Sequence, residues 1–161
     1  MIKTIIFDLD NTLYDAELVK ARQFSKVKEN LRKDLDENEI LVLEREFRTR
    51  NFLQVLELIK DKLGGRRAEE LKEIYINVDL GGIELFDGVL ATLNNINKKI
   101  KKILVTQGTV ENQKEKVERL GLSKYFDRIY YVDDNKKDED KLGYFKKVLI
   151  KFDLHPNEVI I

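Results

Sequence analysis

Four short runs of large apolar residues recur along the chain, and they restrict its fold more than any other feature. They lie at residues 5–7, 103–105, 129–132 and 159–161. Runs of this length are typical of β-strands buried on both faces, and the stretches between them have helical periodicity. Strands that alternate with helices favour a parallel sheet with crossover helices. We therefore expect an α/β fold.

The interval after the first run departs from this alternation. Between residues 15 and 82 no strand pattern appears, and apolar residues recur at helical spacing instead. The apolar positions are Phe24, Val27, Leu31 and Leu35, then Phe52, Leu56, Ile59 and Leu63, then Leu71, Ile74, Tyr75 and Val78. Breaks at 34–38 and 64–65 indicate three or four helices. We expect an all-helical segment at 15–82 between two parts of the sheet domain, residues 1–14 and 83–161.

Composition limits the partners of the chain. Its 161 residues suffice for one compact core with a smaller subdomain. Lysine plus arginine equals aspartate plus glutamate at 30 each, which gives no net charge to attract nucleic acid or an anionic membrane. The lack of cysteine excludes disulfides and thiolate metal sites. No apolar run approaches the ~20 residues that span a bilayer, and no signal-like segment opens the sequence. We expect a soluble cytoplasmic protein that binds neither nucleic acid nor membrane.

The first run ends in two carboxylates, and this is the strongest chemical signal. Residues 5–12 read Ile-Ile-Phe-Asp-Leu-Asp-Asn-Thr. Asp8 and Asp10 would share a face if the extended geometry continued past the apolar residues. Mg²⁺ tolerates such a pair, because it binds one or two carboxylates together with water and phosphate oxygens. One carboxylate can also attack phosphorus while the second acts as acid and base. The alternative is a helix cap or turn after a buried strand, where Asp and Asn are common.

This octet resembles the first motif of the haloacid dehalogenase-like hydrolases, a superfamily made up mostly of phosphatases. The resemblance implies a Rossmann-like parallel sheet with flanking helices plus a small all-helical cap subdomain, here residues 15–82. It also implies that Asp8 is the nucleophile, that Asp10 is the acid/base, and that the Asp8 carboxylate and the Asp10 backbone carbonyl bind Mg²⁺. The helices could instead pack anywhere on the sheet, but an insert after a strand emerges at the carboxyl edge, where such sheets bind ligands. Gly81-Gly82 is the expected return hinge.

The second run leads into Thr106, Gln107 and Gly108. Glycine lets backbone approach a ligand closely, and a hydroxyl with neighbouring N–H groups can donate to a phosphate oxygen. The triplet resembles the second motif of the superfamily, which implies that it binds phosphate and that Thr106 holds the transferring phosphoryl group. Gln107 stands where Asn is more usual, so we expect adjusted loop geometry with retained function.

The resemblance further implies a lysine near the start of a later helix, where it holds the charges of the nucleophile and the phosphoryl group together. The apolar stripe of that helix is Leu142, Phe145, Leu149 and Phe152. Lys136, Lys137 and Lys141 lie nearby. We favour Lys137, directly before a candidate N-cap at Asp138, with Lys141 as the alternative.

Two other sites have a weaker claim. Arg66 and Arg67 follow two glycines and could contact an anionic substrate, but solvation at the surface is the favoured interpretation. His155 precedes Pro156 in a loop, and we assign it a structural or neutral role.

In the superfamily, the strand that corresponds to residues 158–161 is followed by a Gly-Asp pair and a further acid, which complete the metal site. Here the sequence ends at Ile161. We therefore expect a C-terminally incomplete core with impaired activity, and an uncovered C-terminal strand that permits self-association.

The leading hypothesis is a Mg²⁺-dependent phosphatase that hydrolyses a small phosphorylated metabolite through an aspartyl phosphate. A 2-haloacid dehalogenase is the alternative within the superfamily, because that reaction needs the nucleophile but neither Mg²⁺ nor an acid at Asp10. A non-catalytic phosphate-binding or assembly module is the alternative from a different class.

Overall fold

A computed structural model defines two compact units in this chain. The residues that it describes are 1–78, 82–134, 136 and 138–161. One unit comprises Met1–Glu17 with Leu80–Ile161, and the other comprises Leu18–Asp79. We refer to them as the α/β unit and the helical unit, and each is described by itself.

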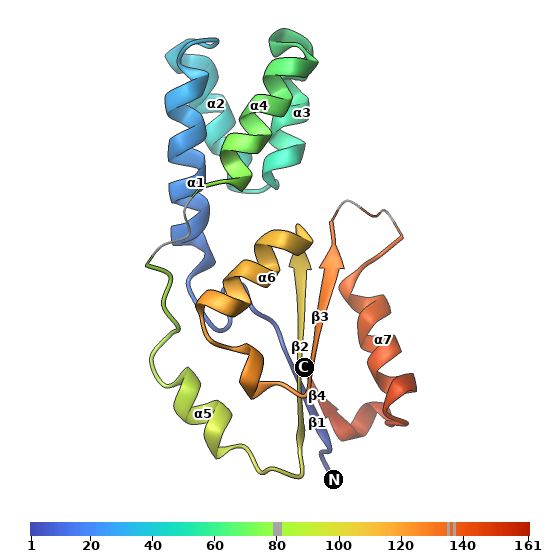
Figure 1. Cartoon of the computed structure of the whole chain (residues 1–161). Coiled ribbons are helices and arrows are strands. Elements are labelled where there is room, and N and C mark those ends of the chain that lie inside the picture. Colours follow the sequence, from blue (N-terminus) through green and yellow to red (C-terminus); the bar gives the residue numbers. More distant parts are fainter. Residues whose placement is uncertain (79–81, 135, 137) are drawn as a thin grey trace. The chain divides into compact units, whose positions relative to one another are not determined.

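The α/β unit is built on a parallel sheet, which within the described residues has four strands in the order β3-β2-β1-β4 (Figure 1). The strands are β1 (Thr4–Phe7), β2 (Lys101–Gly108), β3 (Arg128–Asp133) and β4 (Val159–Ile160). Phe7 of β1 is paired with Leu104 of β2, and Gly108 of β2 with Asp133 of β3. Each expected apolar run contributes a strand, so the α/β prediction is confirmed.

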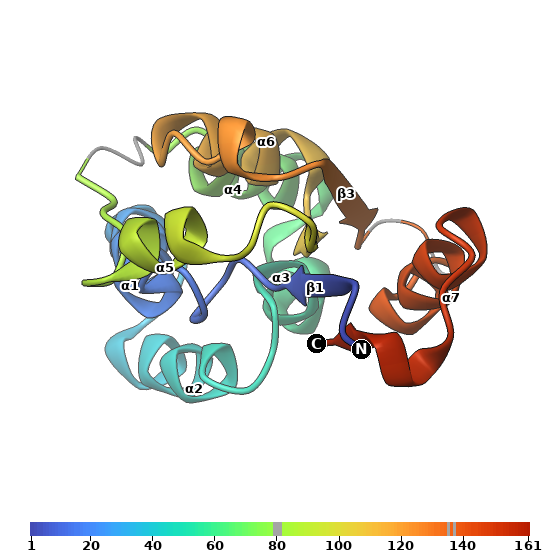
Figure 2. The same cartoon turned by 90° about the horizontal axis from the view of Figure 1, so that it is seen from below.

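Three helices of this unit follow the sheet strands or lead into them. They are α5 (Val89–Asn95), α6 (Val110–Arg119) and α7 (Lys141–Lys151), with 3-10 turns η1 (Ser123–Tyr125) and η2 (Pro156–Glu158). Figure 2 shows α7 on one face of the sheet and α5 and α6 on the other. Gly88 precedes α5 in a left-handed conformation with φ of 81°, which glycine adopts without steric cost.

Strand β2 is buried on both faces. Ile103 and Val105 pack on the α7 side, and the cluster there comprises Ile6, Ile103, Val105, Val132 and Val148. Leu104 and Thr106 alternate with them and therefore point to the opposite face, where they are equally buried. Burial on two faces explains why the run reads as continuously apolar in sequence.

Helix α7 differs in detail from the expectation. Its buried residue is Val148, whereas Leu142 of the predicted stripe is 58% exposed. The predicted N-cap at Asp138 is also wrong. The helix is capped by Asp140, which has the extended backbone that a cap requires and accepts a hydrogen bond of 2.6 Å from the Gly143 backbone N–H. The helix therefore begins at Lys141.

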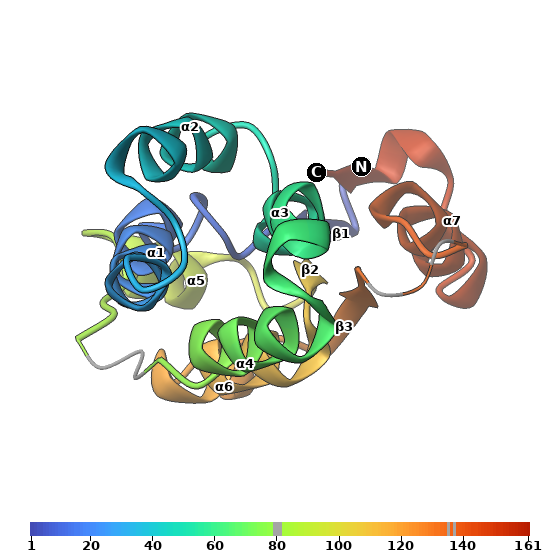
Figure 3. The ribbon, with the colours of Figure 1, turned by 90° about the horizontal axis from the view of Figure 1, so that it is seen from above.

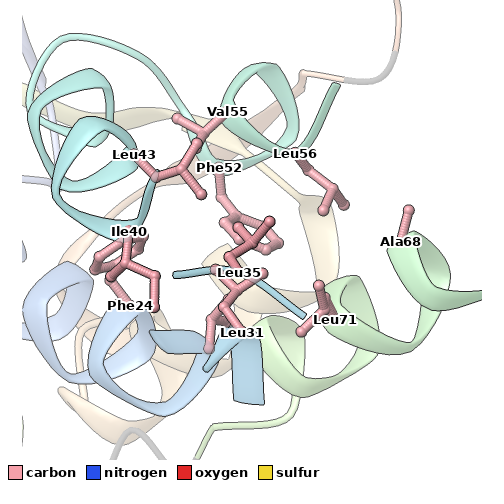
Figure 4. Close-up of a cluster of buried hydrophobic side chains, with 11 residues drawn as sticks. Phe24, Leu31, Leu35, Ile40, Leu43, Phe52, Val55, Leu56, Ala68 and Leu71 are labelled. Atoms are coloured by element: carbon pink, nitrogen blue, oxygen red, sulfur yellow. The ribbon is translucent and has the colours of Figure 1, made fainter. Parts of the chain in front are cut away.

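The helical unit contains four helices within residues 16–76. They are α1 (Ala16–Leu31), α2 (Glu37–Phe47), α3 (Phe52–Leu63) and α4 (Gly65–Ile76). Figure 3 shows them around a shared interior. The core that fills it, drawn in Figure 4, consists of Phe24, Val27, Leu31, Leu35, Ile40, Leu43, Phe52, Val55, Leu56, Ala68 and Leu71. The helical prediction for this interval is confirmed, because its apolar spacing is the spacing of this core.

Capping boxes fix where two of these helices begin. In α2, Asp36 accepts a hydrogen bond of 2.9 Å from the Glu39 N–H, and the Glu39 carboxylate accepts one of 3.0 Å from the Asp36 N–H. Asn51 and Gln54 repeat the arrangement at the start of α3. Each pair satisfies two N–H groups that a helix end leaves without partners.

The segments on either side of the insertion pair with each other within the α/β unit. Tyr14 forms an antiparallel bridge with Leu85, and the Phe86 N–H donates to the Leu13 carbonyl at 2.9 Å. The chain thus enters and leaves the insertion at one point. Of the expected hinge, Gly81 lies outside the described residues and Gly82 has φ of 74°. In the part of the chain that the structure describes, no helix is both long and apolar enough to cross a membrane.

Candidate active site

The predicted chemical residues gather where the parallel strands end. Asp8 and Asp10 follow β1 directly, and the triplet 106–108 completes β2. Strand β1 ends at Phe7, and the chain then turns: the Leu13 N–H donates to the Leu9 carbonyl at 3.0 Å, and Asn11 has φ of 57°. Asparagine tolerates this left-handed conformation. The chain therefore turns between Leu9 and Leu13, and Asp10 lies within that turn.

Among the described residues, Asp8 has one cationic partner, and it remains accessible. Its Oδ2 lies 2.6 Å from the Lys141 ammonium nitrogen, and its Oδ1 accepts a hydrogen bond of 2.8 Å from the Leu9 N–H. The Asp8 side chain is 37% exposed. A reagent can thus reach a carboxylate whose charge is already balanced by a lysine at the first residue of α7.

Asp10 is held by three donors. Its Oδ1 accepts hydrogen bonds from the Tyr14 hydroxyl and, at 2.9 Å, from the Lys116 ammonium. Its Oδ2 accepts one of 2.9 Å from Gln113 Nε2. Burial raises the pKa of the Asp10 carboxyl group, but the Lys116 charge and the three hydrogen bonds lower that pKa by more, so it lies below its usual value. Asp10 is therefore ionised in this arrangement.

The two acids are thus held from opposite faces of the sheet. The lysine on Asp8 belongs to α7, and the lysine on Asp10 belongs to α6. Figure 2 shows these two helices on opposite faces. Each carboxylate has its own ammonium partner, which reduces the repulsion between two nearby anions.

The end of β2 is tied to its neighbours through Gln107. Its Nε2 donates to Asp134 Oδ1 at 2.8 Å, and its carbonyl accepts a hydrogen bond of 2.9 Å from Gln113 Nε2. Thr106 is fully buried, and its hydroxyl has no hydrogen-bond partner among the described residues, as is also true of Thr4. The amide of Gln107 thus bridges the ends of β2 and β3.

The other candidate residues lie elsewhere. Lys137 falls outside the described residues, and Lys136 pairs with Glu139 at 3.3 Å. Within the helical unit, Arg67 pairs with Asp34 at 2.9 Å and with Glu70 at 3.0 Å, whereas the Arg66 side chain is 95% exposed. The imidazole Nδ1 of His155 lies 3.0 Å from Asn157 Oδ1, in the loop after α7. Of the lysines near α7 that the structure describes, Lys141 is the one that contacts Asp8.

Sequence reasoning missed the three residues that hold Asp10. Gln113 and Lys116 are three positions apart on α6 and therefore share a face, and Tyr14 was overlooked in the turn after β1. One signal was available. Val110, Gln113 and Val117 have the i, i+3, i+7 spacing of a buried stripe, so a glutamine occupies an apolar position of this helix.

The oxygen donors at this edge match the preference of Mg²⁺. The Asp8 carboxylate and the Asp10 backbone carbonyl are hard oxygens of the kind that Mg²⁺ binds alongside water and phosphate. The Asp10 side chain is already occupied by its three donors. In the described residues, no group of three or more His, Cys, Asp or Glu side chains is placed to hold a metal.

The chain is a parallel α/β protein with a carboxylate pair at the carboxyl edge of its sheet, and comparison with known proteins gives the family. Residues 2–161 match the family model of the haloacid dehalogenase-like hydrolases. The chain therefore belongs to this family. Its recognition from the first octet and its prediction as a hydrolase are both confirmed.

Named relatives and solved structures agree with this assignment. The chain is 24% identical to the N-acylneuraminate-9-phosphatase of Mus musculus, over 99% of this chain and 73% of that protein. It is 29% identical to a phosphorylated carbohydrates phosphatase of Thermotoga maritima, over 99% of this chain and 75% of that protein. A haloacid dehalogenase superfamily hydrolase of Geobacter sulfurreducens has a similar fold, with a TM-score of 0.70 at 17% identity, over 98% of this chain and 76% of that one.

Proposed function

We propose that this chain is a phosphatase that hydrolyses a small phosphate monoester through an aspartyl phosphate on Asp8. The observation that carries the proposal is the contact between an accessible Asp8 carboxylate and the Lys141 ammonium, 2.6 Å apart at the edge where the strands end. A phosphoryl dianion approaching a carboxylate meets like charge. A lysine between them offsets that repulsion, and this stabilisation is what phosphoryl transfer chiefly needs from a protein.

Two displacements at phosphorus complete the reaction. In the first, an Asp8 oxygen bonds to phosphorus while the bond to the leaving oxygen breaks, and Asp10 donates a proton to that oxygen. In the second, Asp10 accepts a proton from water, the water oxygen bonds to phosphorus, and Asp8 is released with inorganic phosphate. Asp10 must be protonated for the first displacement. A bound phosphoryl dianion favours that state, because like charges raise the pKa of a neighbouring acid.

Mg²⁺ is the cofactor we propose, held by the Asp8 carboxylate and the Asp10 backbone carbonyl. When bound, it would neutralise charge on the phosphoryl oxygens. Lys141 takes the role for which the sequence favoured Lys137, since its ammonium reaches Asp8 from the first turn of α7. We assign the phosphoryl group to the loop of Thr106, Gln107 and Gly108 on the resemblance of that triplet to the second motif.

The relatives support a proposal for the class of substrate. Their names specify an acylneuraminate 9-phosphate and phosphorylated carbohydrates. We propose a phosphorylated sugar or a similar small metabolite for this chain, and we propose that the helical unit serves as the cap that selects the leaving group.

Phosphate release from 4-nitrophenyl phosphate, measured with and without Mg²⁺, tests the proposal. We expect release that depends on Mg²⁺ and that stops when the metal is chelated. Chloride release from 2-chloropropionate without Mg²⁺ would support a dehalogenase instead. Binding of a phosphoryl mimic such as beryllium fluoride, without turnover at high protein concentration, would support a non-catalytic binding module.

A further inference from the structure

Helix α6 contributes two side chains to the Asp10 carboxylate, and neither belongs to the motifs described above. Gln113 contacts one carboxylate oxygen and Lys116 the other, at 2.9 Å each. We infer that Gln113 and Lys116 are positioning residues, which orient the carboxyl group of Asp10 for proton transfer to the leaving group once it is protonated. This inference rests on the proposed function, in which Asp10 is the acid.

The contacts fix the rotation of the carboxylate group. The terminal torsion of an aspartate is broad, so an isolated carboxylate samples many orientations. Here Oδ1 is bound by Lys116 and the Tyr14 hydroxyl, whereas Oδ2 is bound by Gln113. Donors on both oxygens leave one orientation. Proton transfer is sensitive to such geometry, because a displacement of about 1 Å can lower a rate about 10²-fold.

Gln113 also links the acid to the phosphate-binding loop. Its Nε2 donates one hydrogen bond to Asp10 Oδ2 and a second, also 2.9 Å long, to the Gln107 carbonyl. Both acceptors are oxygens, so the amide nitrogen must face them, and the opposite orientation would place oxygen against oxygen. One side chain therefore fixes the segment after β1 and the end of β2 relative to each other.

Gln113 positions the Asp10 side chain but makes the fold less stable. Gln113 is buried, and its Oε1 has no hydrogen-bond partner within the described chain. A buried acceptor without a partner is destabilising. A leucine at this position of α6 would avoid that penalty. A glutamine here is thus better explained by what its nitrogen holds than by packing.

Gly108 gives Gln113 the space that it needs. A Cβ atom at residue 108 would lie 2.5 Å from Gln113 Nε2 and 3.3 Å from its Cδ. Gly108 also has φ of 151°, a conformation that other residues rarely adopt. The glycine that ends β2 therefore permits the close approach of the Gln113 side chain on α6 to this end of the strand, in addition to any contact with phosphate.

Lys116 supplies the charge of the arrangement. Its side chain is 12% exposed, and its ammonium also lies 5.6 Å from the centre of the Tyr14 ring. Replacement by arginine keeps the charge and hydrogen-bond donors, whereas methionine keeps only the apolar stem. These two substitutions separate charge from packing at one position.

The test compares two substrates that differ in their need for an acid. Phenyl phosphate has a basic leaving group that must be protonated, whereas the leaving group of 4-nitrophenyl phosphate departs readily as an anion. The quantity to measure is kcat/KM, which reports only the steps up to loss of the leaving group. For Gln113→Leu and Lys116→Met we expect kcat/KM to fall about 10²-fold with phenyl phosphate and less than about tenfold with 4-nitrophenyl phosphate. Lys116→Arg should restore most of the phenyl phosphate activity.

Lys114→Met is the matched control, since it removes an exposed lysine from the same helix and should leave both substrates unaffected. Equal losses on the two esters, in variants that melt like the parent, would overturn the positioning role and leave the proposed function intact. A parent protein inactive on both esters would refute the function and the inference together. If Gln113→Leu fails to fold, the Met and Arg variants of the less buried Lys116 decide the question.

Discussion

Among the described residues, each unit buries one glutamine, and the two glutamines differ in what they hold. Gln23 is 4% exposed, and its Nε2 donates to the Tyr75 carbonyl at 3.2 Å, a link between α1 and α4 inside the helical unit. Gln113 is 3% exposed and donates to a carboxylate as well as a carbonyl. One amide joins two pieces of backbone, and the other orients an ionised side chain. Burial of a polar side chain thus indicates that it has a role, but not whether the role is to join backbone segments or to orient another side chain.

The contrast extends to the charges of the two units. In the helical unit, ion pairs such as Arg67 with Asp34 lie outside an apolar core. In the α/β unit, the Lys116 side chain that pairs with Asp10 after β1 is 12% exposed, against 22% for Arg67. Burying a charge is costly unless it is paired. A buried pair then holds its two side chains in a more fixed geometry than a surface pair does. We expect substitutions in the α/β site to change activity and those in the helical core to change stability.

Asp8→Asn should give the largest effect. The variant lacks the carboxylate that we propose as the nucleophile, so we expect kcat for phosphate release to fall at least about a thousandfold. The melting temperature should change little, because Asp8 is partly exposed. Asp153→Asn is the control: this residue is exposed, follows α7 at the opposite edge of the sheet, and has φ of 48°, which asparagine accepts. Retained turnover in Asp8→Asn would exclude Asp8 as the nucleophile.

Leu71→Ala should give the opposite result, a loss of stability. Leu71 is fully buried in the helical core, and removal of its side chain leaves a cavity that destabilises a protein by about 2–5 kcal/mol. Urea unfolding of this variant measures the loss. Leu58→Ala, at a residue of α3 that is 52% exposed, is the matched control and should change the free energy of unfolding by less than about 0.5 kcal/mol. Similar losses in both variants would contradict the assignment of the core.

Gln23→Met tests directly whether the two buried glutamines, Gln23 and Gln113, have different roles. The change leaves the Tyr75 carbonyl without this donor, and we expect a loss of about 1–2 kcal/mol in the free energy of unfolding. The Brønsted dependence of kcat/KM on the leaving group should match that of the parent. Gln113→Leu should show the opposite pattern, with a steeper dependence and a smaller stability loss. A steeper dependence in Gln23→Met would remove the contrast between the two residues.

The fold was accessible from sequence because it depends on local periodicity. The strand at 103–105 is apolar on both faces, and the helix that contains Phe52 and Leu56 is apolar on one, so pattern and structure coincide. The start of α7 was harder. Asp138 and Asp140 are both acceptable caps by residue type, and only the backbone geometry distinguishes them.

The proposed site could be read from the sequence only in part, for a physical reason. Asp8, Asp10 and Thr106 each follow an apolar run within a few residues, so a local pattern marks them. The partners of Asp10 do not: Gln113 and Lys116 are more than a hundred residues away and meet it only because α6 packs beside the sheet. Such contacts are tertiary. Because α6 is rich in charged residues, little in its sequence distinguishes a polar residue that contacts the site from one at the surface.

The smallest expected effects come from two helix caps, one in each unit. Asp36 caps α2 in the helical unit and Asp140 caps α7, directly before the lysine that contacts Asp8. Replacing either by alanine should lower the free energy of unfolding by about 1 kcal/mol, and asparagine should restore it. Only Asp140→Ala should also lower kcat/KM for phosphate esters, because a frayed first turn no longer holds Lys141 against the nucleophile. Equal activity in Asp36→Ala and Asp140→Ala would indicate that Lys141 is positioned independently of its cap.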